Sequence, residues 1–150
     1  AVVSIEMLEA VGESNWPRYF QTLYQRLKPG ACAVLQVITI ADHRFPHYRR
    51  QTDFIQRHVF PGGMLPSPSR LRAQAVKAGL KPEHEHTFGL SYARTLALWR
   101  ERFVETWPQI ARQGFDERFC RLWEYYLCYC ETGFRAGTTD VGIYSFRRPG

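Results

Sequence analysis

Hydrophobic residues follow a helical period early in the chain and then form a continuous run. The apolar and aromatic residues of the first stretch are Trp16, Tyr19, Phe20, Leu23, Tyr24 and Leu27, the spacing of an amphipathic helix. We expect Ser14 or Asn15 to cap this helix and Pro29-Gly30 to end it. Residues 31–40 are nearly all apolar and rich in β-branched side chains, which predicts a central parallel strand covered on both faces.

The rest of the chain divides into helical and extended segments by the same criteria. Helices are predicted over residues 68–78, from Tyr92 to about Ile110, and from Asp116 onward, and strands over residues 81–88 and 141–146. We expect Pro108 to kink or end the second helix, and the two strands to pair. Residues 41–57 show no clear period before a short helix over 52–59, and we expect this segment to form a lid.

The order of these elements predicts the fold class. A strand end at residues 1–4, a helix, a strand, a long insert, and then helix, strand, helix pair and strand are typical of the C-terminal half of a doubly wound, Rossmann-like α/β domain with helical additions. With 150 residues and 45% apolar content, we expect one domain over residues 1–150. A domain does not normally begin inside a buried strand, so we expect its first half to lie upstream of residue 1.

Composition narrows the classes of function. No apolar run is long enough to cross a membrane and no signal peptide is evident, so a cytoplasmic protein is expected. The four cysteines lack zinc-type spacing and are expected to be reduced core thiols. The net charge is +6, and the basic residues are scattered in pairs rather than lined up along one helix. This scatter favours a solvated surface as the explanation of the charge, then a membrane contact, and last nucleic acid binding. His43 and His47 are separated by Pro46, and His84 and His86 have no evident third partner, so no metal site is expected.

The segment over residues 58–67 combines unusual backbone with apolar side chains. Two prolines and the pair Gly62-Gly63 exclude a regular helix or a central strand, while Phe60 and Leu65 are too apolar for an ordinary loop. We therefore expect a rigid, largely buried turn that lines a site or holds one together, because buried irregular backbone is costly. An aromatic content of 15% also suits a site for a long apolar chain.

Three motifs carry a resemblance to a known family. They are Phe60-Pro61-Gly62-Gly63-Met64-Leu65-Pro66-Ser67 after Asp53-Phe54-Ile55; Phe88-Gly89, Tyr92, Thr95-Leu96 and Trp99; and Gly114-Phe115, Arg118-Phe119, Trp123 and Tyr125-Tyr126-Leu127. Together with Met7-Leu8-Glu9-Ala10-Val11-Gly12, they resemble the cyclopropane-fatty-acyl-phospholipid synthase and mycolic acid cyclopropane synthase family of S-adenosylmethionine-dependent methyltransferases. Ala10 stands where the family usually has His. The motifs extend over nearly the whole chain.

The resemblance implies a reaction, a substrate and cofactors. The full-length enzyme would transfer the methyl group of S-adenosylmethionine to a cis double bond of a phospholipid acyl chain, and loss of a proton would close a cyclopropane ring. A carbocation forms on the way, so the site must exclude water and hold a base, which in this family is bicarbonate. The cofactor-binding turn is expected upstream of residue 1, so residues 1–150 alone are expected to be inactive. A peripheral, transient membrane contact would follow from the lipid substrate, and homodimer formation stays open.

The matched motifs also indicate which residues of this chain correspond to the family's site residues. The residues expected to hold the base are Glu9, Gln36, Ile38 and Tyr92. Glu9 would accept the hydroxyl proton of bicarbonate and Tyr92 would donate to the ion. The residues expected to line the acyl chain are Phe60, Gly62, Gly63, Leu65, Trp99 and Tyr126. From the residues alone, Gln36 fits a satisfied core amide equally well. For Glu9 and Tyr92 we favour the functional roles over the alternatives, which are a helix-terminus carboxylate and a core aromatic.

Two other functions stay open from the sequence. Small-molecule N-methyltransferases of the same family share the Phe-Pro-Gly-Gly pattern, and product analysis would separate them from a cyclopropane synthase. A non-catalytic lipid-binding or interaction module is the alternative from a different class. Nucleic acid binding is disfavoured, because the aromatic residues follow helical core spacing rather than alternating with basic residues.

Overall fold

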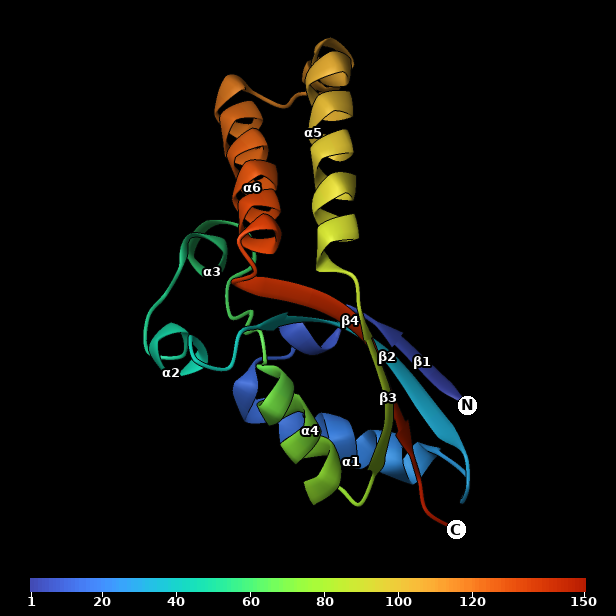
Figure 1. Cartoon of the computed structure of the whole chain (residues 1–150). Helices are drawn as coiled ribbons and strands as arrows, with labels where there is room; N and C mark the ends of the chain where they lie inside the picture. The colour runs from blue at the N-terminus through green and yellow to red at the C-terminus, as the bar shows by residue number, and fades with distance from the viewer.

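A four-stranded mixed sheet organises residues 1–150, all of which the computed structural model describes (Figure 1). Its strands are β1 (Val2–Ile5), β2 (Cys32–Ile40), β3 (Lys81–Thr87) and β4 (Thr139–Arg147). Their order across the sheet is β1-β2-β4-β3, with β1 parallel to β2, and with β4 antiparallel to both of its neighbours. The predicted strand over residues 31–40 and the predicted pairing of residues 81–88 with 141–146 are therefore confirmed.

Six α-helices and two short 3-10 helices connect the strands. They are η1 (Leu8–Ala10), η2 (Glu13–Asn15), α1 (Trp16–Arg26), α2 (Phe45–Tyr48), α3 (Phe54–His58), α4 (Pro68–Lys77), α5 (Gly89–Ala111) and α6 (Glu117–Arg135). All the predicted helices are present. None of them has the length and apolar content needed to cross a bilayer.

The main core lies between the sheet and the helices α1 and α4, which cover one of its faces (Figure 1). Trp16 and Phe20 of α1 and Leu71 of α4 are fully buried against Leu35 of β2. Phe20 also meets Phe146 of β4 edge to face, with ring centroids 5.9 Å apart. The apolar residues of α1 that recur at helical spacing thus form the face of the helix that packs on the sheet.

A smaller core lies where the helical pair α5 and α6 meets the sheet. Its fully buried members are Ala93, Leu96, Leu127, Phe134 and Val141, and Ile38 of β2 packs against them. The pair stands out from one end of the sheet, while both chain termini lie toward the other end (Figure 1). The α5–α6 pair therefore covers the other sheet face only near the C-terminal end of β2.

The second face of the sheet is only partly covered, so the prediction that these strands are buried on both faces is wrong. Val3 and Ile5 of β1 are 68% and 65% exposed. Alternate residues of β2, beginning with Cys32 and Val34, are only half-buried, whereas the residues between them are buried. The apolar runs were correctly predicted as strands, but within residues 1–150 no helix lies over that part of the sheet.

Two local predictions are also wrong, and a third, that Pro108 kinks or ends its helix, is wrong for the second of its two alternatives. Neither Ser14 nor Asn15 caps α1 through its side chain, and the Asn15 amide instead donates to the carbonyl oxygen of Val11 at 2.6 Å. The helix α5 does not end at Pro108 but continues to Ala111. The turn over residues 58–67 is not largely buried, because Phe60 is 52% exposed and only Pro66 and Ser67 are fully buried.

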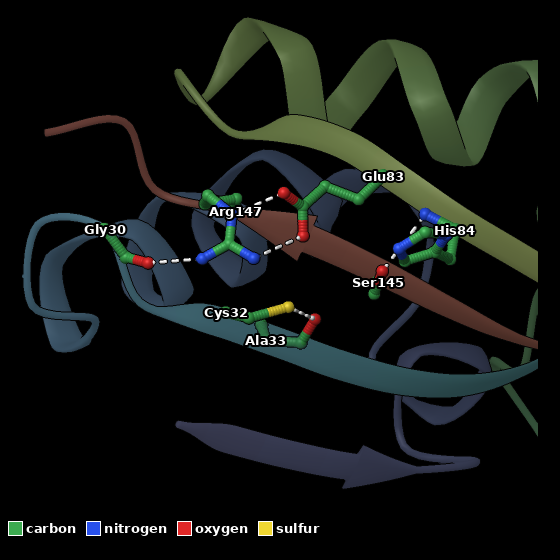
Figure 2. Close-up of polar contacts among 7 residues, drawn as sticks. All are labelled: Gly30, Cys32, Ala33, Glu83, His84, Ser145 and Arg147. Carbon is green, nitrogen blue, oxygen red and sulfur yellow. Dashed lines mark hydrogen bonds and ion pairs between the residues drawn. The ribbon is translucent and has the colours of Figure 1, made fainter.

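Arg147 ties the sheet together at the end away from the α5–α6 pair. Figure 2 shows its guanidinium between Glu83 of β3 and Gly30 in the turn before β2. It contacts both carboxylate oxygens of Glu83 and donates to the Gly30 carbonyl at 2.6 Å. Beside it, the backbone N–H of His84 donates to the hydroxyl of Ser145 at 3.1 Å. These contacts fix the register of β3 and β4 where only one face of the sheet is covered by helices.

Candidate active site

Glu9 is a buried acid at the C-terminal end of the two parallel strands. It lies on η1, just after β1, and its Oε1 accepts a hydrogen bond from the backbone N–H of Ile38 at 2.6 Å. Its Oε2 is buried without a partner. Burial raises the pKa of Glu9 to about 7, against the lowering effect of the Ile38 N–H, and the nearby charge of Glu6 adds to the rise. A carboxyl with such a pKa can accept or release a proton near neutral pH.

The double-glycine segment packs directly against Glu9. The backbone N–H of Met64 donates to the Glu9 carbonyl at 2.8 Å. At Gly63 an added Cβ would lie 3.1 Å from the Phe60 carbonyl oxygen and 3.6 Å from that of Glu9. Nε2 of Gln56, on α3, donates a hydrogen bond to the Gly63 carbonyl oxygen at 2.8 Å. Glycine is needed at position 63 because backbone approaches backbone there.

Glu6 joins Gln36 and Tyr92, which are far apart in the sequence. Its Oε1 accepts hydrogen bonds from the Gln36 amide and from the Tyr92 hydroxyl, each at 2.7 Å. Glu6 has a φ of 49°, a left-handed conformation that costs a non-glycine residue about 1 kcal/mol. The single hydroxyl proton of Tyr92 therefore goes to the Glu6 carboxylate in this arrangement.

Aromatic rings surround the Tyr92 side of the site. Tyr92 meets Phe134 and Trp99 edge to face, at centroid distances of 5.2 and 6.2 Å. The ring of Phe60 lies 6.0 Å from that of Tyr126 and approaches it in the same way. Burial is the main cause that raises the pKa of both Tyr92 and Tyr126, so both phenols are neutral at physiological pH. The Tyr92 side of the site is therefore lined by uncharged aromatic rings.

The structure brings together most, but not all, of the residues selected from sequence. Gln36 and Ile38 lie on one face of β2, where Glu6 binds the first and Glu9 the second. Phe60, Trp99 and Tyr126 contact the aromatic side chains of α5 and α6. Leu65 does not, because it packs against the core under α1 and α4.

Glu6 was missed by sequence reasoning. The residue precedes the recognised motif by one position, and a single acid after a strand has no pattern of its own. Its positive φ, which would have marked it, is visible only in the structure.

A cavity of about 270 Å³ borders the double-glycine segment. Arg49, Arg50, Gln56 and Gly62 are among the residues that line it. Arg49 pairs with Glu13 at 2.7 Å. Arg50 donates through Nε to the Pro46 carbonyl at 2.9 Å and has no carboxylate partner. The cavity therefore presents a guanidinium that is free to bind an anion.

Comparison with known proteins extends the sequence resemblance. The model of the mycolic acid cyclopropane synthetase family matches residues 1–143. Tuberculostearic acid methyltransferase UfaA1 of Mycobacterium tuberculosis is 44% identical over 100% of this chain and 35% of its own length. Cyclopropane-fatty-acyl-phospholipid synthase of Escherichia coli is 36% identical over 98% of this chain and 37% of its own length. The chain thus spans little more than a third of these relatives.

A solved structure supports the same assignment. Mycolic acid cyclopropane synthase CmaA1 in complex with SAH and CTAB is 27% identical, with a TM-score of 0.86 over 96% of this chain and 53% of that one. The predicted fold class, a class I methyltransferase α/β fold of which this chain forms about half, is confirmed. The chain belongs to the mycolic acid cyclopropane synthetase family of S-adenosylmethionine-dependent methyltransferases.

Proposed function

We propose that the full-length protein transfers a methyl group from S-adenosylmethionine to a cis double bond of a phospholipid acyl chain and closes a cyclopropane ring. The observation that carries this proposal is the carboxyl of Glu9. It is buried at the end of β2, has an oxygen without a partner, and lies close to Glu6, which binds the aromatic Tyr92. An acid of this kind beside an aromatic wall suits chemistry that forms a cation and then removes a proton.

The reaction forms two carbon–carbon bonds. S-adenosylmethionine supplies the methyl group, whose carbon–sulfur bond breaks as the alkene carbon bonds to it. The resulting cation loses a proton from the new methyl group, and the electron pair of that C–H bond closes the ring. The rings of Tyr92, Trp99 and Phe134 favour a neighbouring cation by roughly 0.5 to 2 kcal/mol per contact. Of the three rings, that of Phe134 is buried and so keeps water, which would trap the cation, away from its side of the site.

The site residues fit a bound bicarbonate. Glu9 Oε2, which has no partner, would accept the hydroxyl proton of the ion, and the second Nε2 hydrogen of Gln36 would donate to it. The Ile38 N–H, which now binds Glu9, is a third group able to hold the anion. When bound, bicarbonate supplies the base that accepts the proton lost from the methyl group.

The cavity near Arg50 supports a phospholipid substrate. The guanidinium of Arg50, which has no carboxylate partner, would bind the phosphate of a head group. The aromatic rings of Phe60 and Tyr126 would hold the acyl chain. Both ends of this amphipathic ligand would then be fixed relative to Glu9. Such binding requires at least a transient contact with the membrane surface, so we include peripheral membrane association in the proposal.

Product analysis tests this function. The full-length gene would be expressed in a bacterium that makes unsaturated phospholipids but no cyclopropane fatty acids. We expect acyl chains heavier by one methylene group, with the upfield proton signals of a cyclopropane ring in NMR spectra. A Glu9→Gln variant should accumulate much less product, and Glu105→Gln, on the exposed surface of α5, should match the wild type. Methylated amines with unchanged acyl chains would instead identify a small-molecule N-methyltransferase.

A second candidate function is methyl transfer without ring closure. It is favoured by the 44% identical relative, which is named a methyltransferase of a fatty acid. The same cation would lose a proton from a neighbouring chain carbon. The electron pair of that C–H bond would form a double bond in the chain, and a methyl-branched alkene would remain. The NMR spectrum of the product separates the two, because only the ring gives upfield cyclopropane protons.

A further inference from the structure

Glu6 has a backbone conformation that glycine favours and other residues avoid. Its φ of 49° is the only positive φ at a non-glycine residue in the chain. Glycine would adopt this conformation without strain, whereas Glu6 must be held in it by its surroundings. The contacts of its side chain indicate why an acid is present at this position.

The carboxylate of Glu6 fixes one strand residue and one helix residue through the same oxygen. Oε1 accepts from Nε2 of Gln36 on β2 and from the hydroxyl of Tyr92 on α5, each at 2.7 Å. The backbone N–H of Glu6 also donates to the Gln36 carbonyl at 2.9 Å. A hydroxyl has one proton and an amide nitrogen has two. Glu6 therefore takes the only proton of Tyr92 and leaves one amide hydrogen of Gln36 free.

We propose that Glu6 is a positioning residue of the methyl-transfer site, which turns Tyr92 into an acceptor and leaves one N–H of Gln36 to bind the anionic base. The inference rests on the proposed function, because it assigns these two groups to the cation and the base. A phenol that donates to a carboxylate carries more negative charge on its oxygen. That oxygen favours a cation beside it. Glu6 touches neither reacting group and acts through Tyr92 and Gln36.

The charge of Glu6 also acts on Glu9. Burial is the main reason that the pKa of Glu9 is raised, and the charge of Glu6 raises it further. The other titratable groups near this acid pair are Tyr19 on α1 and Tyr92 and Tyr126 on the helical pair. All three are phenols, and burial is the main cause that raises the pKa of each. Removing the charge of Glu6 should therefore lower the pKa of Glu9 whether or not the protein turns over.

Kinetics of five variants of the full-length protein, including Tyr92→Phe alone, test the inference. Glu6→Gln should lower kcat about 10- to 100-fold with little change in KM, because it removes a charge and misdirects Tyr92 without touching the substrate. Glu6→Gly removes the strain with the side chain, so it should keep or raise Tm and still lose kcat. Combining Glu6→Gln with Tyr92→Phe should lose less activity than the two single losses added together, because part of the effect of Glu6 passes through the Tyr92 hydroxyl. The control Glu105→Gln should leave kcat unchanged.

A second measurement does not require turnover. Carbon-13 NMR titration of the Glu9 carboxyl should give a lower pKa in Glu6→Gln than in the wild type, with the same folded spectrum elsewhere. Wild-type kcat in Glu6→Gly, fully additive losses in the double variant, or an unchanged Glu9 pKa would each overturn the inference. A wild-type protein that modifies no acyl chain would defeat the proposed function instead, and the NMR titration would then decide the role of Glu6 by itself.

Discussion

The buried carboxyl of Glu9 makes a sharp prediction about stability and pH. Its pKa is raised from an ordinary value of 4.5 to about 7, chiefly by burial. An acid with a higher pKa in the folded state binds its proton more tightly when folded, so it favours folding at low pH. This contribution is complete below about pH 4.5 and is lost as the pH rises through about 7.

The size of the effect follows from the shift. Each pKa unit corresponds to about 1.4 kcal/mol, so this one residue should lower the free energy of unfolding by about 3 kcal/mol between pH 4 and pH 8. Replacing Glu9 by Gln removes the charge. The new amide oxygen can still accept from the Ile38 N–H, which now binds Glu9 at 2.6 Å. The variant should therefore lack this part of the pH dependence and be the more stable protein at pH 8.

Urea unfolding followed by circular dichroism, at several pH values from 4.5 to 8, measures this difference directly. The relevant quantity is the gap between wild type and Glu9→Gln at each pH, because other titrating groups cancel from it. Glu105→Gln, a change of the same kind on the exposed surface of α5, is the control and should parallel the wild type. If the gap between wild type and Glu9→Gln stays constant across the range, Glu9 is not a buried acid with a raised pKa.

Three further predictions concern packing and binding. Gly63→Ala should lower the free energy of unfolding by about 1 to 3 kcal/mol in urea titrations and reduce activity, since the added Cβ lies 3.1 Å from the Phe60 carbonyl; wild-type values for both would contradict the close approach. Phe20→Ala should cost about 3 to 5 kcal/mol in thermal unfolding, because its ring is fully buried against the sheet; a loss below 1 kcal/mol would show that the core can collapse around the change. Arg50→Gln should raise KM for anionic phospholipid vesicles several-fold at low salt and leave kcat unchanged, whereas an equal change for a free fatty acid substrate would exclude binding of the phosphate.

The sequence was sufficient for the elements of the fold. The one-sided period of α1 predicted the face that packs on the sheet, and the apolar run of β2 predicted a strand but not that one of its faces is only half-buried. Glu9, Gln36, Ile38 and Tyr92 were selected from motifs. The pattern could not show that Glu9 meets Ile38 while Gln36 and Tyr92 share Glu6, because that pairing depends on the path of the chain after β1.

Exposure was the least predictable property. Phe60 and Val3 are apolar in sequence and yet more than half exposed. Whether an apolar side chain is covered depends on which element lies over it, and that information is not local. Pro108 shows the same limit for backbone, since α5 accommodates a proline near its C-terminal end and continues for three more residues.

The place of β4 has a consequence for how the protein is made. It follows every other element in the chain, yet it lies inside the sheet between β2 and β3. The ladder of β3 is formed with β4 alone, so β3 has no strand to join until residues 139–147 have been synthesised. The α5–α6 hairpin, built from neighbouring segments, can assemble earlier. A nascent chain would thus expose unpaired strand edges on β2 and β3 until residues 139–147 have been made, which makes chaperone binding most valuable at that stage of synthesis.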